Sequence, residues 1–133
     1  MYVAVYGSNY LVKLNAAGVE QTRASFVDDP DLAAGIRAIA AEDGYIYASF
    51  YGGVVAKINA NTLKVEKKLV IENGYNLEGV AISNNMLYVA NSYKQVDGKW
   101  VYLNDVFVVD LATFTLKEKL AVATNPNVLM EED

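Results

Sequence analysis

Apolar and polar residues alternate in short runs along almost the whole chain, which is typical of half-buried β-strands rather than of helices. The runs 45–50 and 87–91 follow the pairs Asp-Gly at 43–44 and Asn-Asn at 84–85, whose residues tolerate a positive φ and favour tight hairpins. The other runs are 1–6, 11–15, 19–27, 36–41, 54–59, 64–71, 77–83, 106–110 and 116–123. We therefore expect an all-β protein of short antiparallel strands.

The strand pattern repeats along the chain. Residues 36–51 (IRAIAAEDGYIYASFY) align without a gap on residues 77–92 (LEGVAISNNMLYVANS) at an offset of 41. That length corresponds to one four-stranded blade of a β-propeller. Pieces of a third copy occur at the two ends, where 2–7 matches 47–52 and 126–133 matches 36–43. The repeat therefore predicts a β-propeller with about three blades in this chain.

The alignment also predicts how the chain divides into blades, whose four strands we call A, B, C and D in chain order. Strands B, C and D of an incomplete blade occupy 1–34, a complete blade occupies 35–75, a second occupies 76–124, and strand A of an incomplete blade occupies 125–133. In the blade at 76–124 the third and fourth strands match those of the preceding blade at an offset of 51, ten more than elsewhere. We interpret the extra residues, Tyr93–Leu103 and their surroundings, as an inserted loop between strands B and C.

One stretch also fits a helix. Residues 116–130 have apolar positions compatible with helical spacing, but Asn-Pro-Asn at 125–127 would interrupt a helix. The equivalent stretches of the other copies have strand patterns, so the strand is the favoured prediction.

Composition excludes several kinds of site. The chain has neither histidine nor cysteine, which removes histidine-based triads, histidine-based zinc sites, disulfides and cysteine nucleophiles. Its net charge is −5 and its basic residues are scattered, which argues against nucleic acid as a partner. No apolar run approaches the roughly 20 residues of a membrane-spanning helix. We predict no metal, no cofactor and no membrane span.

The segments LYVANS (87–92), VFVVDLATFTLKEKLAV (106–122) and NPNVLM (125–130) resemble the YVTN-type β-propeller repeat, and the resemblance extends over nearly the whole chain. It is strongest to a branch found among Gram-negative surface lipoproteins. The resemblance implies a propeller of about seven blades, a location at the cell surface or in the periplasm, and a binding or scaffolding role, which in some relatives is corrinoid capture. This chain has about three blades and no lipid-acceptor cysteine.

Three blades cannot close a ring, because closure needs about four or more. The sequence leaves two solutions open. The chain is a fragment of a longer propeller, or two copies form a C2 homodimer with six blades. In the homodimer, residues 125–133 of one copy would complete the blade at 1–27 of the other.

The loops of one face are rich in aromatic residues. Antiparallel strand order brings the B–C connection of every blade and the connections between blades to one face, which we call the loop face. Repeat scaffolds usually bind through such variable loops, and aromatic side chains are enriched at recognition surfaces. We predict that a ligand or protein partner binds there through Tyr51, Tyr75, Tyr93, Trp100 and Tyr102. Arg37 and Glu78 occupy equivalent positions of the repeat, with Asn127 in the third copy, and the resemblance implies that these positions face the central channel, where they would contact a small molecule. The alternatives are that Tyr6, Tyr51 and Trp100 pack one blade on the next and that Arg37 and Glu78 only solvate the channel.

Two other chemistries fit the sequence less well. Asp28, Asp29 and Asp31 could offer oxygen ligands to calcium, but their spacing does not match an EF-hand, and solvated acids are the simpler interpretation. No motif places a pair of carboxylates as in a glycosidase, and no phosphate-binding loop is present. The predicted function is a non-enzymatic binding module for a small molecule or a protein partner. The alternatives are a scaffolding fragment of a larger surface propeller and a carboxylate-based enzyme.

Overall fold

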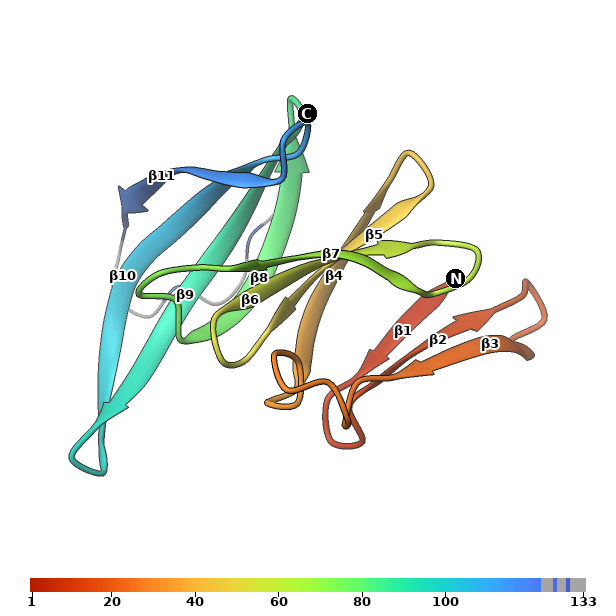
Figure 1. The fold of residues 1–133 in the computed structure, drawn as a ribbon, viewed down its shortest axis with the longest axis horizontal. Helices are drawn as coiled ribbons and strands as arrows, with labels where there is room; N and C mark the ends of the chain where they lie inside the picture. Colours follow the sequence, from red (N-terminus) through yellow and green to blue (C-terminus); the bar gives the residue numbers. More distant parts are fainter. Residues whose placement is uncertain (123–125, 127–128, 130–133) are drawn as a thin grey trace.

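The computed structural model describes residues 1–122, 126 and 129, and in that part of the chain it contains strands and no helix. The strands are β1 (Tyr2–Val5), β2 (Tyr10–Leu14), β3 (Glu20–Ser25), β4 (Ile36–Glu42), β5 (Tyr45–Phe50), β6 (Val54–Asn59), β7 (Val65–Val70), β8 (Asn76–Ser83), β9 (Met86–Val96), β10 (Lys99–Asp110) and β11 (Thr115–Ala121). They form three antiparallel sheets side by side, which we call the first (β1–β3), middle (β4–β7) and third (β8–β11) sheets (Figure 1). The predicted all-β class is confirmed.

The tight turns form at the predicted pairs. The φ angles are 51° at Asp43 and 83° at Gly44 between β4 and β5, and 51° at Asn84 and 61° at Asn85 between β8 and β9. The helical alternative for 116–130 is wrong over 116–121, because these residues belong to β11. The strand predicted at 125–133 lies outside the described residues, except for 126 and 129.

The inserted loop predicted at Tyr93–Leu103 is wrong, because these residues extend β9 and β10 into one long hairpin. The hairpin projects beyond the other connections of the loop face, at the lower left of Figure 1. Its two-residue turn has φ angles of 52° at Asp97 and 75° at Gly98, as a type I′ turn requires. Asp-Gly between alternating apolar residues is itself a strong hairpin signal, and it outweighs the loop interpretation.

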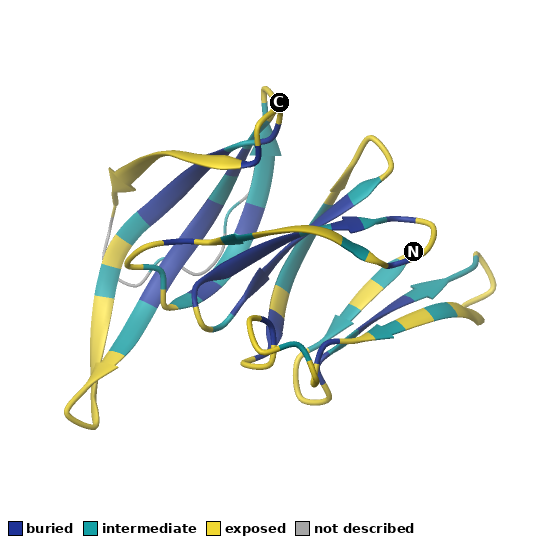
Figure 2. Cartoon of the chain, viewed as in Figure 1, coloured by how far each residue is buried: buried dark blue, intermediate teal, exposed yellow. Residues whose placement is uncertain are grey.

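The two central strands of the middle sheet are buried on both faces, as the dark segments of β5 and β6 show in Figure 2. Successive side chains of a strand point to opposite faces. Accordingly, Ile46 and Ala56 belong to the core shared with the first sheet, whereas Tyr47 and Val55 belong to the core shared with the third sheet. The three sheets therefore have no separate cores, since each core lies between two neighbouring sheets.

Two buried asparagines fix the connections between sheets. The Asn9 side chain donates to the carbonyl of Leu32 at 3.0 Å and accepts from the backbone N–H of Ile36 at 2.9 Å. The Asn91 side chain accepts from the backbone N–H of Tyr75 at 3.1 Å. Buried backbone groups need such partners, so these side chains hold the connections in place where no strand ladder reaches them.

Two glycines bring the β5–β6 turn against the β7–β8 connection. Gly53 has a φ of +81°, and a Cβ added to it would lie 2.2 Å from the carbonyl oxygen of Gly74. Next to it, the N–H of Gly52 donates to the carbonyl of Tyr75 at 2.8 Å. The loop face is therefore closed between the middle and third sheets by direct backbone contact.

We expect Gly53→Ala to lower the free energy of unfolding by about 2–4 kcal/mol, because positive φ strain adds to a steric clash with backbone. Gly44→Ala is the matched control, since Gly44 has a φ of +83° but nothing within 4 Å of its added Cβ. Urea denaturation followed by circular dichroism measures both losses. Equal losses would show that the contact with Gly74 does not constrain the fold.

Candidate functional site

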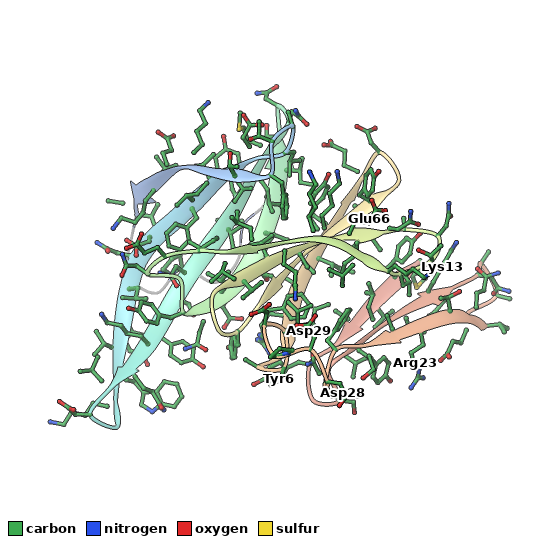
Figure 3. The ribbon with its side chains drawn as sticks, in the orientation of Figure 1. Tyr6, Lys13, Arg23, Asp28, Asp29 and Glu66 are labelled. Carbon is green, nitrogen blue, oxygen red and sulfur yellow. The ribbon has the colours of Figure 1, made fainter. Side chains whose placement is uncertain are left out.

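The loop face is formed by the β1–β2 and β5–β6 turns, the extended β9–β10 hairpin, and the connections 26–35 and 71–75. The tip of the hairpin, the β1–β2 turn and the connection 26–35 lie along the lower edge of the molecule in Figure 1. Tyr6, Asp28 and Asp29, labelled in Figure 3, come from two of them. The structure thus gathers the variable connections of all three sheets on one side.

Four aromatic side chains form a row of successive contacts along this face, which we call the aromatic row. The ring centroids are 5.4 Å apart for Tyr6 and Tyr51, 5.9 Å for Tyr51 and Tyr93, and 4.7 Å for Tyr93 and Trp100. Tyr6 follows β1 of the first sheet, Tyr51 follows β5 of the middle sheet, and Tyr93 and Trp100 lie on the hairpin of the third sheet. The row therefore runs from the first sheet to the third.

An ion pair between neighbouring sheets lies against the row. Arg37 on β4 donates through Nε to Glu78 Oε1 on β8 at 2.8 Å, and the Tyr51 hydroxyl donates to Glu78 Oε2 at 2.8 Å. The guanidinium of Arg37 lies 4.8 Å from the Tyr6 ring centroid and 5.0 Å from that of Tyr51. Cation–π attraction and the ion pair thus hold these side chains in one arrangement.

Burial raises the pKa of the Tyr51 hydroxyl far above its usual value, and the hydrogen bond to Glu78 raises it further. Tyr51 therefore stays protonated and acts as a hydrogen-bond donor rather than as an acid or base. Its contacts join the middle sheet to both neighbours, so the packing alternative describes part of its role.

The hairpin presents a flat aromatic face to solvent. Trp100 pairs with Gln95 and Tyr102 pairs with Tyr93 in the β9–β10 register, and cross-strand partners point to the same side. Trp100 and Tyr102 are each 58% exposed. The exposed area consequently lies at the outer end of the aromatic row.

Tyr75 lies apart from the row, beside a small hollow. The Lys94 Nζ lies 5.2 Å from the centroid of the Tyr75 ring. The hollow has a volume of about 160 Å³ and is lined by Gly52, Gly74, Tyr75, Asn76, Lys94 and Gln95. The loop face thus carries an exposed aromatic surface and a polar recess next to it.

The structure brings most of the predicted site residues together. Arg37, Glu78, Tyr51, Tyr93 and Trp100 form one chain of contacts, Tyr102 pairs with Tyr93, and Tyr75 lies at the hollow.

Sequence reasoning missed four participants. Tyr6 was left out of the predicted site although it occupies the repeat position of Tyr51. Asn76, Lys94 and Gln95 line the hollow, and no spacing in the sequence indicates their approach to Gly52 and Gly74.

The acidic loop after β3 is engaged by a lysine. Lys68 Nζ lies 3.2 Å from Asp29 Oδ1 and 2.8 Å from Asp31 Oδ2, and Asp29 also accepts from the backbone N–H of Asp31. Within the described residues, no three acidic side chains are placed to hold a metal ion. These contacts favour the simpler interpretation of Asp28, Asp29 and Asp31 over a calcium site.

The part of the chain that the structure describes has no helix long and apolar enough to cross a membrane.

Neither a known family model nor a curated protein matches the sequence. Solved structures do match the fold. AztD from Citrobacter koseri superposes with a TM-score of 0.69 at 13% identity, over 96% of this chain and 34% of that one. The WD40 domain of Neurospora crassa Pan2 gives 0.63 at 16% identity, over 92% and 36%. Glutaminyl cyclase from Myxococcus xanthus gives 0.63 at 10% identity, over 91% and 48%.

The chain has a β-propeller fold. It spans between about a third and a half of the length of these three structures. In propeller terms, β4 and β8 are the inner strands of adjacent blades, and Arg37 and Glu78 join those blades at equivalent repeat positions. The propellers that it matches include an enzyme, so the fold alone does not assign a function.

We expect Glu78→Ala to lower the free energy of unfolding of the propeller by about 1–3 kcal/mol, because Arg37 and the Tyr51 hydroxyl both lose their partner. Glu20→Ala is the control, since it removes an ion pair with Arg23 whose side chains are 46% and 48% exposed, and it should leave stability unchanged. Thermal and urea unfolding measure the difference. A loss no larger than that of the control would mean that the contacts of Glu78 with Arg37 and Tyr51 do not help to hold the two blades together.

Proposed function

We propose that this propeller is a non-enzymatic binding module that recognises a small molecule or a protein partner on its loop face. The observation that carries the proposal is the exposed aromatic face of the β9–β10 hairpin. Trp100 and Tyr102 present large rings to solvent from a segment that the repeat does not require. Large rings on rigid strands lose little conformational entropy on binding, which suits them to recognition.

The pairing of Glu78 supports binding over catalysis. Both oxygens of its carboxylate are occupied, one by Arg37 and one by Tyr51, so it serves as an acceptor in a fixed arrangement. A carboxylate-based enzyme would need two carboxylates converging on a substrate. The scaffolding alternative requires instead that the aromatic hairpin be covered by another part of the assembly.

The repeats are, on this proposal, of the YVTN type, and the protein works at the cell surface or in the periplasm. The support is the sequence resemblance at 87–92 and 106–122, which form parts of β9 and of β10 to β11.

The double variant Trp100→Ala/Tyr102→Ala should lose binding to hits from a small-molecule library and a peptide array, by at least about tenfold in Kd, because hot spots centre on such rings. Its melting temperature should stay close to that of the unchanged protein, since both side chains are exposed. Val19→Ala is the control, being equally exposed at 58% but on the opposite face. Biolayer interferometry measures binding. Reduced stability with unchanged binding would assign the two rings to the scaffold.

A second candidate is self-association into a six-bladed ring. Within the described residues, β1 pairs with β2 on one edge and with no strand on the other, whereas the middle and third sheets have four strands each. The face of the first sheet that turns away from the middle sheet carries Val3 and Val12. We propose that residues 125–133 of a second copy pair with β1 and that the two copies cover each other's open faces.

Light scattering over a dilution series should then give the mass of a dimer. Val3→Glu should shift the mass to that of a monomer, because it buries an uncompensated charge in the contact. Val19→Glu, in the turn between β2 and β3, should remain dimeric. A compact monomer of the unchanged protein at every concentration would refute the ring.

A further inference from the structure

The hollow on the loop face is built from backbone on one side and polar side chains on the other. Gly52 and Gly74 supply the backbone side, and a side chain at Gly74 would meet Ile71 at about 3.0–3.1 Å. Lys94 and Gln95 approach from β9, and Tyr75 and Asn76 from the start of β8. The recess therefore lies between the β5–β6 turn, the β7–β8 connection and the base of the hairpin.

The donors around the hollow fit a carboxylate. Lys94 makes no ion pair within the described residues, and its Nζ lies over the face of Tyr75. Gln95 follows Lys94 on β9, so its side chain points to the opposite face and it offers only backbone to this side of the hollow. The Lys94 ammonium group at a recess can donate a charge-assisted hydrogen bond to one carboxylate. Such a cationic recess stands out in a chain whose net charge is −5.

The size of the hollow limits what it can hold. Pockets for whole small-molecule ligands commonly measure about 300–1,000 Å³. The volume here is about 160 Å³, which suits a single side chain. We therefore expect one acidic side chain of a larger ligand to enter it, as an anchor residue does at an interface.

The backbone beside the hollow is free to pair with a strand. In a hairpin closed by a two-residue type I′ turn, the residues next to the turn form a hydrogen-bonded pair, here Val96 with Lys99, and Lys94 with Val101 is the next such pair. Gln95 lies between them, so its N–H and C=O point away from β10. The partner of β9 on that side, β8, has its first residue, Asn76, opposite Tyr93. Within the described chain, the edge at Gln95 thus has no strand beside it.

From this arrangement we propose that the hollow binds the carboxylate of a glutamate or aspartate in an extended peptide segment of a protein partner. The segment adds to the edge of β9 at Gln95, in line with β8, and Lys94 receives the acidic side chain. The proposal rests on the proposed binding function and names the partner chemistry of the same face. Strand addition of this kind takes affinity from backbone hydrogen bonds and specificity from pockets for alternate side chains.

The test uses the single tryptophan, Trp100, as a fluorescence probe on the same hairpin. The ligands are end-blocked octapeptides of alternating valine and serine with a central glutamate, the same peptides with a central glutamine, and free glutarate. The glutamate peptide should bind at least about tenfold more tightly than the glutamine peptide, because it adds a charge-assisted hydrogen bond. Glutarate should bind more weakly than the glutamate peptide, since it lacks a backbone to pair with Gln95.

Three variants locate the effect. Lys94→Met should remove the preference for glutamate and Lys94→Arg should retain it. Lys99→Met, at the tip of the hairpin and outside the hollow, should leave it unchanged. N-methylation of the glutamate peptide at alternate residues should abolish binding, because it removes the N–H groups of the added strand.

Equal affinity for the glutamate and glutamine peptides, or an unchanged preference in Lys94→Met, would overturn the proposal. Glutarate binding as tight as the peptide would overturn its peptide part and identify a site for free carboxylic acids. These outcomes differ from failure of the proposed function, in which Trp100→Ala/Tyr102→Ala, measured by biolayer interferometry because it lacks the tryptophan probe, leaves all binding intact. If that double variant loses binding while Lys94→Met keeps the preference for glutamate, only the carboxylate site is refuted.

Discussion

Burial of the two central strands of the middle sheet on both faces is the constraint on which the loop face depends. Strands β5 and β6 contribute side chains alternately to two cores, so neither neighbouring sheet can shift without exposing apolar surface. The ends of these strands are therefore fixed relative to the connections of both neighbours. Backbone contact of Gly53 with Gly74 and the bridge between Tyr51 and Asn76 follow from that placement. A hollow and a row of aromatic rings can form at such an edge without dedicated elements to position them.

A repeat brings equivalent positions of adjacent blades next to each other, and this has an electrostatic consequence. Arg37 and Glu78 are separated by one repeat length of 41 residues and meet between the inner strands β4 and β8. Two identical charges at this position would repel each other where partial burial strengthens the interaction. Opposite charges remove the repulsion and also orient the Tyr51 hydroxyl. Divergence of the repeat at this position is thus explained by packing as well as by ligand binding.

The sequence predicted most strands because period-two patterns and turn pairs are local signals, as at Asp43 and Asn84. The hairpin at 93–103 was missed because comparison of repeats treats additional residues as a loop, although the local Asp97-Gly98 signal indicates a strand turn. Contacts between blades were beyond local pattern. The hydrogen bonds of Asn9 depend on where the connection after β3 passes. The hollow beside Lys94 is lined by Gly74 and Gly52, which are about twenty and forty residues away in the sequence. Such proximities arise from how the sheets pack, which a single sequence does not encode in any spacing.

The hairpin is the feature that stability alone does not account for. Exposed strand edges promote unwanted pairing, and proteins usually protect them with charge, proline or a bulge. Here Lys99 and Asp97 lie at the tip and the register shifts between Tyr102 and Asp105, yet Val101 and the rings of Trp100 and Tyr102 remain exposed. The rest of the blade is complete without the extension, since β8 pairs with β9 and β11 pairs with β10 outside the extended part of the hairpin. An extension that adds apolar edge without adding core lowers solubility, and binding of a partner to that edge is the benefit that would offset this cost.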